Sequence, residues 1–153
     1  MPMQSYAIAL GSNRRGRHGS PREEVRAALR AIGGVIAASP IIDTPPIGPS
    51  IRRFANMVAI IESTLSPPEL MRRLKAIERA YGRRRGRRWG ARVIDLDIIL
   101  WSGGCWVDRA VTLPHPQFRG RAFVLDPLAA IARDWRDPVT GLRVGQLRHR
   151  LRG

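Results

Sequence analysis

The sequence contains a single cysteine, Cys105, among its 153 residues. One cysteine excludes an intrachain disulfide, and it excludes zinc or iron–sulfur sites built from several thiolates of this chain. Long apolar runs are also lacking: the first one covers only Tyr6 to Leu10 and follows no basic segment, whereas a membrane span needs roughly 20 apolar residues. We therefore expect a cytoplasmic protein that has no membrane partner.

Lysine and acidic residues are scarce as well. The 27 basic residues are one lysine, Lys75, and 26 arginines, and with only 12 acidic residues the formal charge is +15. Guanidinium groups are planar and bind phosphate through a fork of donors, so this composition favours phosphate binding over simple solubility. Nucleic acid, an anionic membrane surface and a nucleotide triphosphate all suit such a charge, and only motifs distinguish them.

Length and a hydrophobic content of 44% indicate one domain, residues 1–153, with a real core. Apolar periodicity and helix caps predict six elements in the first two thirds of the chain. These are a strand over Met3–Leu10, a helix over Ser20–Ile32, strands over Val35–Ser39 and Phe54–Glu62, a helix from Ser66 to about Tyr81, and a strand over Val93–Leu100. This order predicts an α+β, ferredoxin-like sandwich, an antiparallel sheet covered by helices.

The remaining segments are less regular. The proline-rich stretch Asp43–Pro49 is expected to be a loop. A short helix is expected near Leu125–Ala132, and Val144, Leu147 and Leu151 suit a last amphipathic turn or two. A ferredoxin-like sandwich hosts many functions, RNA binding among them, so the fold alone names none.

The strongest chemical signal is Asp95-Leu96-Asp97, inside an apolar strand. Side chains alternate along a strand, so both carboxylates leave the same face about 7 Å apart while Leu96 points into the core. Two hard anionic ligands at this spacing suit one or two Mg²⁺ ions, which share their other positions with water and phosphate oxygens. A solvent-facing acidic pair on an ordinary amphipathic strand is the alternative.

Six arginines precede these aspartates at positions 83, 84, 85, 87, 88 and 92. Acids for Mg²⁺ beside guanidinium groups for phosphate are what a metal–nucleotide complex requires, whereas a nucleic-acid groove needs only the second. A solvated loop is the alternative for any single arginine, and Arg83 and Arg92 are the preferred candidates. His115 lies between two prolines, close to Arg119 and Arg121, and is either structural or a phosphate contact.

Other nucleotide motifs are not found. The segment Gly11–His18 approaches a phosphate-binding P-loop, but Arg17-His18 stands where lysine followed by serine or threonine is needed. A dinucleotide fingerprint, a kinase catalytic triplet and a nucleophile elbow are likewise missing.

Taken together, these residues resemble the 6-hydroxymethyl-7,8-dihydropterin pyrophosphokinases over nearly the whole chain. Each motif is weak alone, but their order and spacing are highly specific. The motifs are Gly11-Ser12-Asn13, Thr44-Pro45-Pro46-Ile47-Gly48-Pro49, Phe54 with Asn56, Glu78 with Gly82-Arg83, Arg88-Trp89-Gly90, Arg92, Asp95-Leu96-Asp97-Ile98, Pro114-His115-Pro116, and Arg121 with Phe123.

The resemblance implies a ferredoxin-like fold and transfer of the β,γ-pyrophosphoryl group of ATP to the pterin hydroxymethyl oxygen, with release of AMP, in folate biosynthesis. It implies that Asp95 and Asp97 hold two Mg²⁺ ions. The residues implied for ATP are Glu78, Arg83, Arg92, Ile98, Thr112, His115 and Arg121, and those implied for catalysis are Arg83, Arg92 and Asp97. The residues implied for the pterin are Thr44, Pro45, Ile47, Phe54, Asn56, Trp89, Asp95 and Phe123, with the ring stacked between the two phenylalanines.

The mechanism then rests on charge neutralisation and in-line positioning of the attacking oxygen. Asp97 is a candidate proton acceptor, although a metal-bound carboxylate is a poor base. The basic loops Arg14–Gly19 and Arg83–Arg88 are hypothesised lids that order when both substrates bind. We expect a monomer that binds no nucleic acid.

The chain departs from the family pattern at a few positions. Arg52-Arg53 replaces Gln-Pro, Ala91 replaces Pro, Ala130 replaces an acid, and Arg14–Gly19 is an insertion. None of these removes a metal or stacking residue, so we expect activity to persist. The alternatives are a nucleic-acid-binding domain, which would need more exposed sheet aromatics than Tyr6 and Phe54, and a catalytically impaired paralogue, against which the acidic pair argues.

Overall fold

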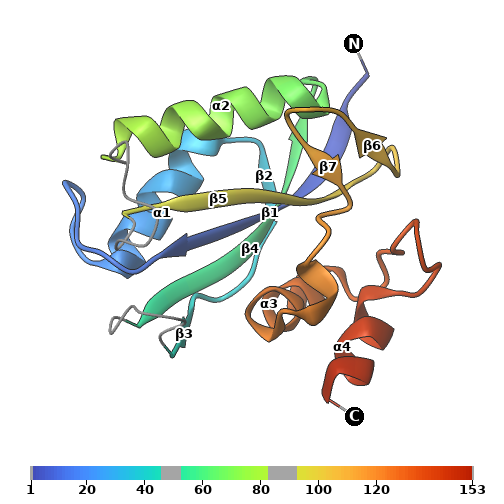
Figure 1. The fold of residues 1–153 in the computed structure, drawn as a ribbon. Coiled ribbons are helices and arrows are strands. Elements are labelled where there is room, and N and C mark those ends of the chain that lie inside the picture. Colours follow the sequence, from blue (N-terminus) through green and yellow to red (C-terminus); the bar gives the residue numbers. More distant parts are fainter. Residues whose placement is uncertain (1, 46–52, 83–92, 153) are drawn as a thin grey trace.

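A computed structural model describes residues 2–45, 53–82 and 93–152 (Figure 1). Its main sheet has the strand order β2-β4-β1-β5, every neighbouring pair is antiparallel, and β3 also pairs with β4. The strands are β1 (Gln4–Ser12), β2 (Val35–Ala38), β3 (Ile42–Thr44), β4 (Phe54–Ser63) and β5 (Asp95–Trp101). The predicted antiparallel α+β fold is confirmed.

The helices lie on both faces of this sheet (Figure 1). Helices α1 (Pro21–Ile32) and α2 (Pro67–Ala80) cover one face, and α3 (Ala122–Ala132) packs on the other, with α4 (Val144–Arg152) against α3. A short ribbon of β6 (Trp106–Val107) and β7 (Thr112–Leu113), followed by the 3-10 helix η1 (Phe118–Gly120), connects β5 to α3. The two faces therefore bury two separate cores.

Local sequence accounts for where α1 and α2 begin. Ser20 accepts a hydrogen bond from the backbone N–H of Glu23, and the Glu23 carboxylate accepts one from the backbone N–H of Ser20. Ser66 and Glu69 form the same capping box at α2, and a proline follows each cap. These reciprocal bonds satisfy N–H groups that have no partner within a helix.

Alternation along β5 assigns its side chains to the two faces. Leu96 and Ile98 are buried in the core beneath α1 and α2, whereas Ile99 belongs to the core beneath α3. The pairing of β5 with β1 shifts register by one residue between Ile98 and Leu100, and the local alternation changes there. Before that shift, Asp95 and Asp97 point away from Leu96 and toward the face of α3.

The structure differs from the sequence-based expectations in four local features. The strand expected to end at Leu10 is longer, because β1 continues to Ser12 in register with β4. Asp43 and Thr44 are not in a loop but in β3, since they pair with Ala55 and Phe54. The β6–β7 ribbon was not expected, and Leu151 is exposed instead of belonging to the apolar stripe of α4.

Candidate functional site

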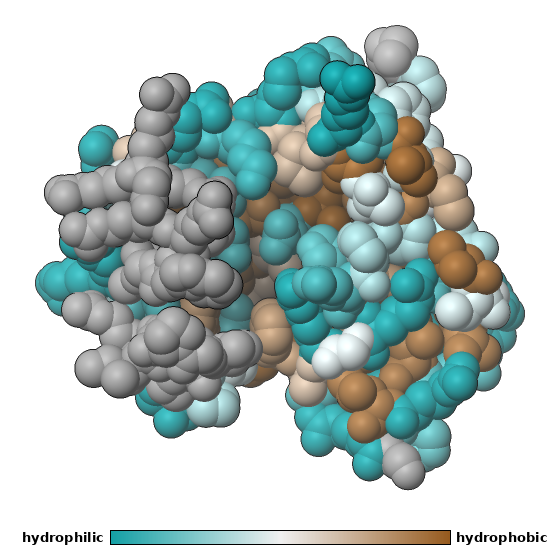
Figure 2. All heavy atoms as spheres, viewed as in Figure 1, coloured by the Kyte–Doolittle hydropathy of each residue, from teal (hydrophilic) through white to brown (hydrophobic). Residues whose placement is uncertain are grey.

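A cavity of about 330 Å³ lies between the sheet and the start of α3. Figure 2 shows this view of the molecule hollowed over the middle of the sheet, with apolar atoms at the bottom and hydrophilic atoms along the rim. Seven of the candidate site residues line the cavity: Thr44, Phe54, Asn56, Asp95, Asp97, Arg121 and Phe123. The volume is near the lower end of the roughly 300–1,000 Å³ typical of small-molecule sites.

The sheet register explains why the polar residues gather here. Gly11 on β1 is paired with Asn56 on β4 and with Asp95 on β5, and Ala9 is paired with Asp97. Paired residues on neighbouring antiparallel strands project to the same face. Because Ala9 and Gly11 have little or no side chain, space remains above β1, between the amide on β4 and the carboxylates on β5.

Asn56 is held in one orientation. Its Nδ2 donates a hydrogen bond of 2.7 Å to the Oγ1 of Thr44 on β3, and the side chain is almost fully buried. A Cβ at position 11 would lie 2.8 Å from the Oδ1 of Asn56, which is closer than such atoms approach. Glycine at position 11 therefore permits the Asn56 amide to lie over β1.

Two aromatic rings and one cation form the side of the cavity. Phe54 begins β4, and Phe123 is in the first turn of α3; both are half-buried. The Cζ of Arg121, at the start of α3, lies 5.7 Å from the centre of the Phe123 ring, and Arg121 also donates to the Oε1 of Gln117. Since the rings border a cavity, they differ from phenylalanines of a closed core such as Phe118.

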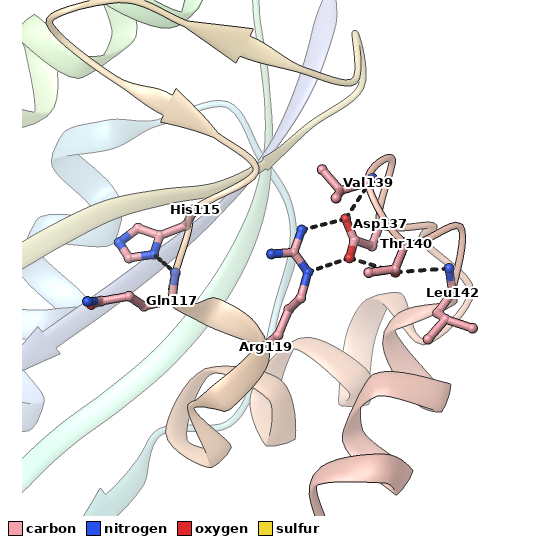
Figure 3. Close-up of polar contacts among 7 residues, drawn as sticks. All are labelled: His115, Gln117, Arg119, Asp137, Val139, Thr140 and Leu142. Carbon is pink, nitrogen blue, oxygen red and sulfur yellow. Dashed lines mark hydrogen bonds and ion pairs between the residues drawn. The ribbon is translucent and has the colours of Figure 1, made fainter.

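His115 has a defined tautomer in its neutral form (Figure 3). Its backbone N–H donates to the carbonyl of Ile99 at 2.9 Å, and its Nδ1 accepts from the backbone N–H of Gln117 at 3.1 Å. The pKa of His115 is lowered mainly by burial and also by the charge of Arg121, against the opposing effect of Asp95. The neutral ring therefore carries its proton on Nε2, which makes that atom a donor.

Of the described residues implied for ATP, only Arg121 lines the cavity, and His115 does not. The other three lie on or beside the outer edge of β5. The Oε2 of Glu78, a buried residue on α2, accepts a 2.8 Å hydrogen bond from the backbone N–H of Leu96. Residues two apart in a strand direct their backbone N–H and C=O groups to the same side, so those of Ile98 face the outer edge of β5, as the N–H of Leu96 does. The Ile98 side chain is in the core. Thr112 is exposed on β7, which contacts β5.

Several candidates have no described position. Ile47, Arg83, Trp89 and Arg92 lie outside the described residues, as does the proposed lid Arg83–Arg88. Pro45 is described and exposed, and it is not among the residues that line the cavity.

The inserted segment Arg14–Gly19 is bonded to the helical layer. The backbone N–H of His18 donates to Glu24 at 2.8 Å, and its Nδ1 lies 2.8 Å from the other oxygen of that buried carboxylate. The His18 ring also stacks on Tyr81, at the end of α2, with centroids 4.5 Å apart. Nothing local in the sequence indicates that Glu24 has this partner, because the two residues meet only when the segment before α1 folds back.

The described parts of the chain contain no group of three or more histidine, cysteine and acidic side chains that could hold a metal. Asp95 and Asp97 are therefore a two-carboxylate set facing one cavity. Such a set suits Mg²⁺, which keeps several water molecules and phosphate oxygens among its ligands, better than zinc. Within the same parts of the chain, no helix is long and apolar enough to cross a membrane.

Comparison with known proteins gives a consistent result. Residues 7–133 match the family model of 7,8-dihydro-6-hydroxymethylpterin-pyrophosphokinase. The 2-amino-4-hydroxy-6-hydroxymethyldihydropteridine pyrophosphokinase of Pseudomonas aeruginosa is 40% identical over 142 residues, which are 89% of this chain and 85% of that protein. The enzyme of the same name from Haemophilus influenzae is 40% identical over 133 residues, 83% of this chain and 81% of the relative.

Among solved structures, wild-type Plasmodium falciparum HPPK-DHPS has a TM-score of 0.75 and 13% sequence identity, and the match covers 97% of this chain. At this identity the match supports the fold only. The present chain spans 45% of that longer chain.

Proposed function

The chain belongs to the 7,8-dihydro-6-hydroxymethylpterin pyrophosphokinase family, and from this premise we propose how its cavity serves the reaction. The reaction is pyrophosphoryl transfer from ATP to 6-hydroxymethyl-7,8-dihydropterin in folate biosynthesis. The observation that carries the proposal is the meeting of Asp95 and Asp97 with Asn56, Phe54 and Phe123 around one cavity. A nucleic-acid-binding function is not favoured, since it gives no role to this acidic pair.

The cavity is proposed to bind the pterin. A flat bicyclic ring gains apolar burial and stacking between Phe54 and Phe123. The Asn56 amide, fixed by Thr44, is directed at the polar edge of the ring, and the backbone near Thr44, Pro45 and Ile47 is proposed to complete that edge. Trp89 is proposed to cover the ring.

ATP is proposed to lie along the outer side of β5. Antiparallel alternation leaves the backbone of Ile98 directed outward, where it offers a donor and an acceptor to an adenine edge. Glu78 and Thr112 adjoin the same side of β5. The phosphates would then extend toward Arg121, at the cavity, and His115, with Arg83 and Arg92 as further phosphate ligands.

Asp95 and Asp97 are the residues that would hold two Mg²⁺ ions. Bound there, Mg²⁺ supplies neutralisation of phosphate charge and a template for the two substrates. The two carboxylates determine where Mg²⁺ would bind, which is next to the hydroxymethyl group of a pterin ring stacked in the cavity.

The other side chains act on the phosphates and on the attacking oxygen. Arg121 places a guanidinium group at the cavity, and the Nε2–H of neutral His115 donates to an oxygen without adding repulsion toward that arginine. Two half-buried rings exclude water around the attacking oxygen, which strengthens these contacts. Arg83, Arg92 and Asp97 are proposed as catalytic, with Asp97 the candidate proton acceptor.

The test is incubation of the pure protein with Mg²⁺, ATP and hydroxymethyldihydropterin. AMP as the nucleotide product is expected, and ADP would contradict the proposal. Asp95→Ala or Asp97→Ala is expected nearly to abolish AMP release with the fold intact, and wild-type-like turnover in either would refute the metal assignment. Asp43→Ala, at an exposed strand aspartate on β3, is the matched control and should retain activity.

We further propose a cytoplasmic monomer. The single cysteine suits a reducing compartment, and the proposed site uses residues of one chain only. Light scattering of the purified protein at the monomer mass is the expected result.

A further inference from the structure

An ion pair with a buried carboxylate joins the 3-10 helix η1 to the turn that precedes α4 (Figure 3). The Nε and an Nη of Arg119 donate to the two carboxylate oxygens of Asp137 at 2.5 and 2.8 Å. The Asp137 side chain is 0% exposed and that of Arg119 is 27% exposed. Because two donors of one guanidinium group bind the two oxygens of one carboxylate, the orientation of the guanidinium plane is fixed as well as its distance from Asp137.

The Asp137 carboxylate also accepts hydrogen bonds from residues of its own turn. The hydroxyl of Thr140 donates to it at 2.7 Å and the backbone N–H of Val139 at 3.0 Å, so both oxygens have a second partner. Burial alone would raise the pKa of Asp137, but the hydrogen bonds from Arg119, Thr140 and Val139 lower it to about 2. The carboxylate is thus a fixed, charged receptor for Arg119.

Arg119 occupies the middle of the segment that carries two proposed ATP ligands. His115 precedes it and Arg121 follows it, and η1 between them is a single short 3-10 turn, which is weakly stable by itself. The segment is attached at its start by the bond from the His115 N–H to Ile99, and at Phe118 by burial in the core. In Figure 3 His115 lies on the side away from Asp137, whereas Arg119 points to it.

We propose that Asp137, acting through Arg119, is a positioning residue for the nucleotide-binding side chains His115 and Arg121. The inference rests on the proposed assignment of those two side chains to ATP. The segment is also bonded at its end, where the Arg121 carbonyl accepts from the backbone N–H groups of Val124 and Leu125. Without the ion pair, the middle of the segment loses its attachment, and His115 and Arg121 are held less closely at the cavity. Asp137 lies beyond residues 7–133, the part that matches the family model, so this chain supplies the attachment from its C-terminal region.

The central variant is Asp137→Asn, which keeps the shape of the side chain and removes its charge. The expected result is a rise of roughly three- to tenfold in both the KM for ATP and the Kd for a nonhydrolysable ATP analogue, less than the ~100-fold loss that a full 1 Å misplacement can cause. The KM for the pterin should stay within about twofold of wild type, and backbone amides of residues 118–125 should exchange faster. Arg119→Lys keeps the positive charge but loses the two-donor guanidinium group. It should show a smaller rise in the KM and Kd for the nucleotide, again with little change in the KM for the pterin.

The matched control is Asp126→Asn on α3. Asp126 pairs with Arg148 and Arg152, so it also attaches α4, but it has no bond to residues 115–121. This variant should leave the nucleotide Kd and the exchange of residues 118–125 unchanged, whatever it does to Tm.

A purely structural role gives a different outcome: Asp137→Asn would lower Tm while the folded protein kept wild-type nucleotide affinity, and that result overturns the proposal. If Asp137→Asn does not fold, Arg119→Lys and Thr140→Ala decide in the same way, since each keeps the opposite charges. Nucleotide binding and amide exchange require no turnover, so this test is separate from that of the proposed function, which fails if the wild-type protein releases no AMP.

Discussion

Replacement of Gly11 by alanine tests whether the open floor of the cavity is needed for pterin binding. The added Cβ would lie 2.8 Å from the Oδ1 of Asn56, so the amide must move. Asn56 is buried and bonded to Thr44 at 2.7 Å, so movement strains or breaks a buried hydrogen bond. That loss costs about 1–2 kcal/mol, which corresponds to roughly 5- to 30-fold in affinity.

Calorimetric titration with hydroxymethyldihydropterin is the assay. The Kd for the pterin should rise by that factor in Gly11→Ala, while the Kd for an ATP analogue stays near wild type. Gly120→Ala is the matched control, because a Cβ there meets no other atom within 4 Å. Wild-type pterin affinity in Gly11→Ala would show that Asn56 is not positioned by contact with β1, and the reasoning would fail.

Three further outcomes follow from the same geometry. Phe123→Ala should raise the KM for the pterin about tenfold through lost stacking and burial, whereas Phe118→Ala should destabilise the fold by about 3–5 kcal/mol with little change in pterin KM; equal pterin KM values in the two variants would contradict the cavity assignment. The pKa of Asp137 in the folded state is depressed to about 2, so the Asp137 carboxylate contributes about 2 kcal/mol to the free energy of unfolding above pH ~4, and this contribution is lost as the pH falls toward 2. Urea unfolding measured from pH 5 to 2.5 should show this decrease in the free energy of unfolding for the wild-type protein but not for Asp137→Asn. The pKa of His115 is lowered, so His115 should stay neutral from pH 7 to 8 and cause no change in the KM for ATP over that range. The KM for ATP of His115→Gln, measured over the same pH range, should be equally independent of pH.

Short-range patterns predicted much of this site. Period-two alternation placed Asp95 and Asp97 on one face with Leu96 opposite, and the structure has all three so arranged. The two capping boxes are also local, so the starts of α1 and α2 could be predicted from adjacent residues.

Features that depend on distant partners could not be predicted in the same way. The bond from Leu96 to Glu78 forms only when α2 packs against β5, and β3 exists because Thr44 meets Phe54 across the sheet. Arg119 and Asp137 were two unrelated charges in the sequence, since their pairing depends on how the turn before α4 folds back. The charges and the hydrophobic periodicity of the sequence do not indicate these long-range contacts.

We propose that the pterin ring lies between Phe54 and Phe123 with its hydroxymethyl group toward Asp95 and Asp97. A crystal structure with Mg²⁺, hydroxymethyldihydropterin and a nonhydrolysable ATP analogue measures this directly. We predict the ring in this cavity, within hydrogen-bond distance of Asn56, with Mg²⁺ on both carboxylates. A pterin bound elsewhere, or Mg²⁺ held without either aspartate, would contradict the account.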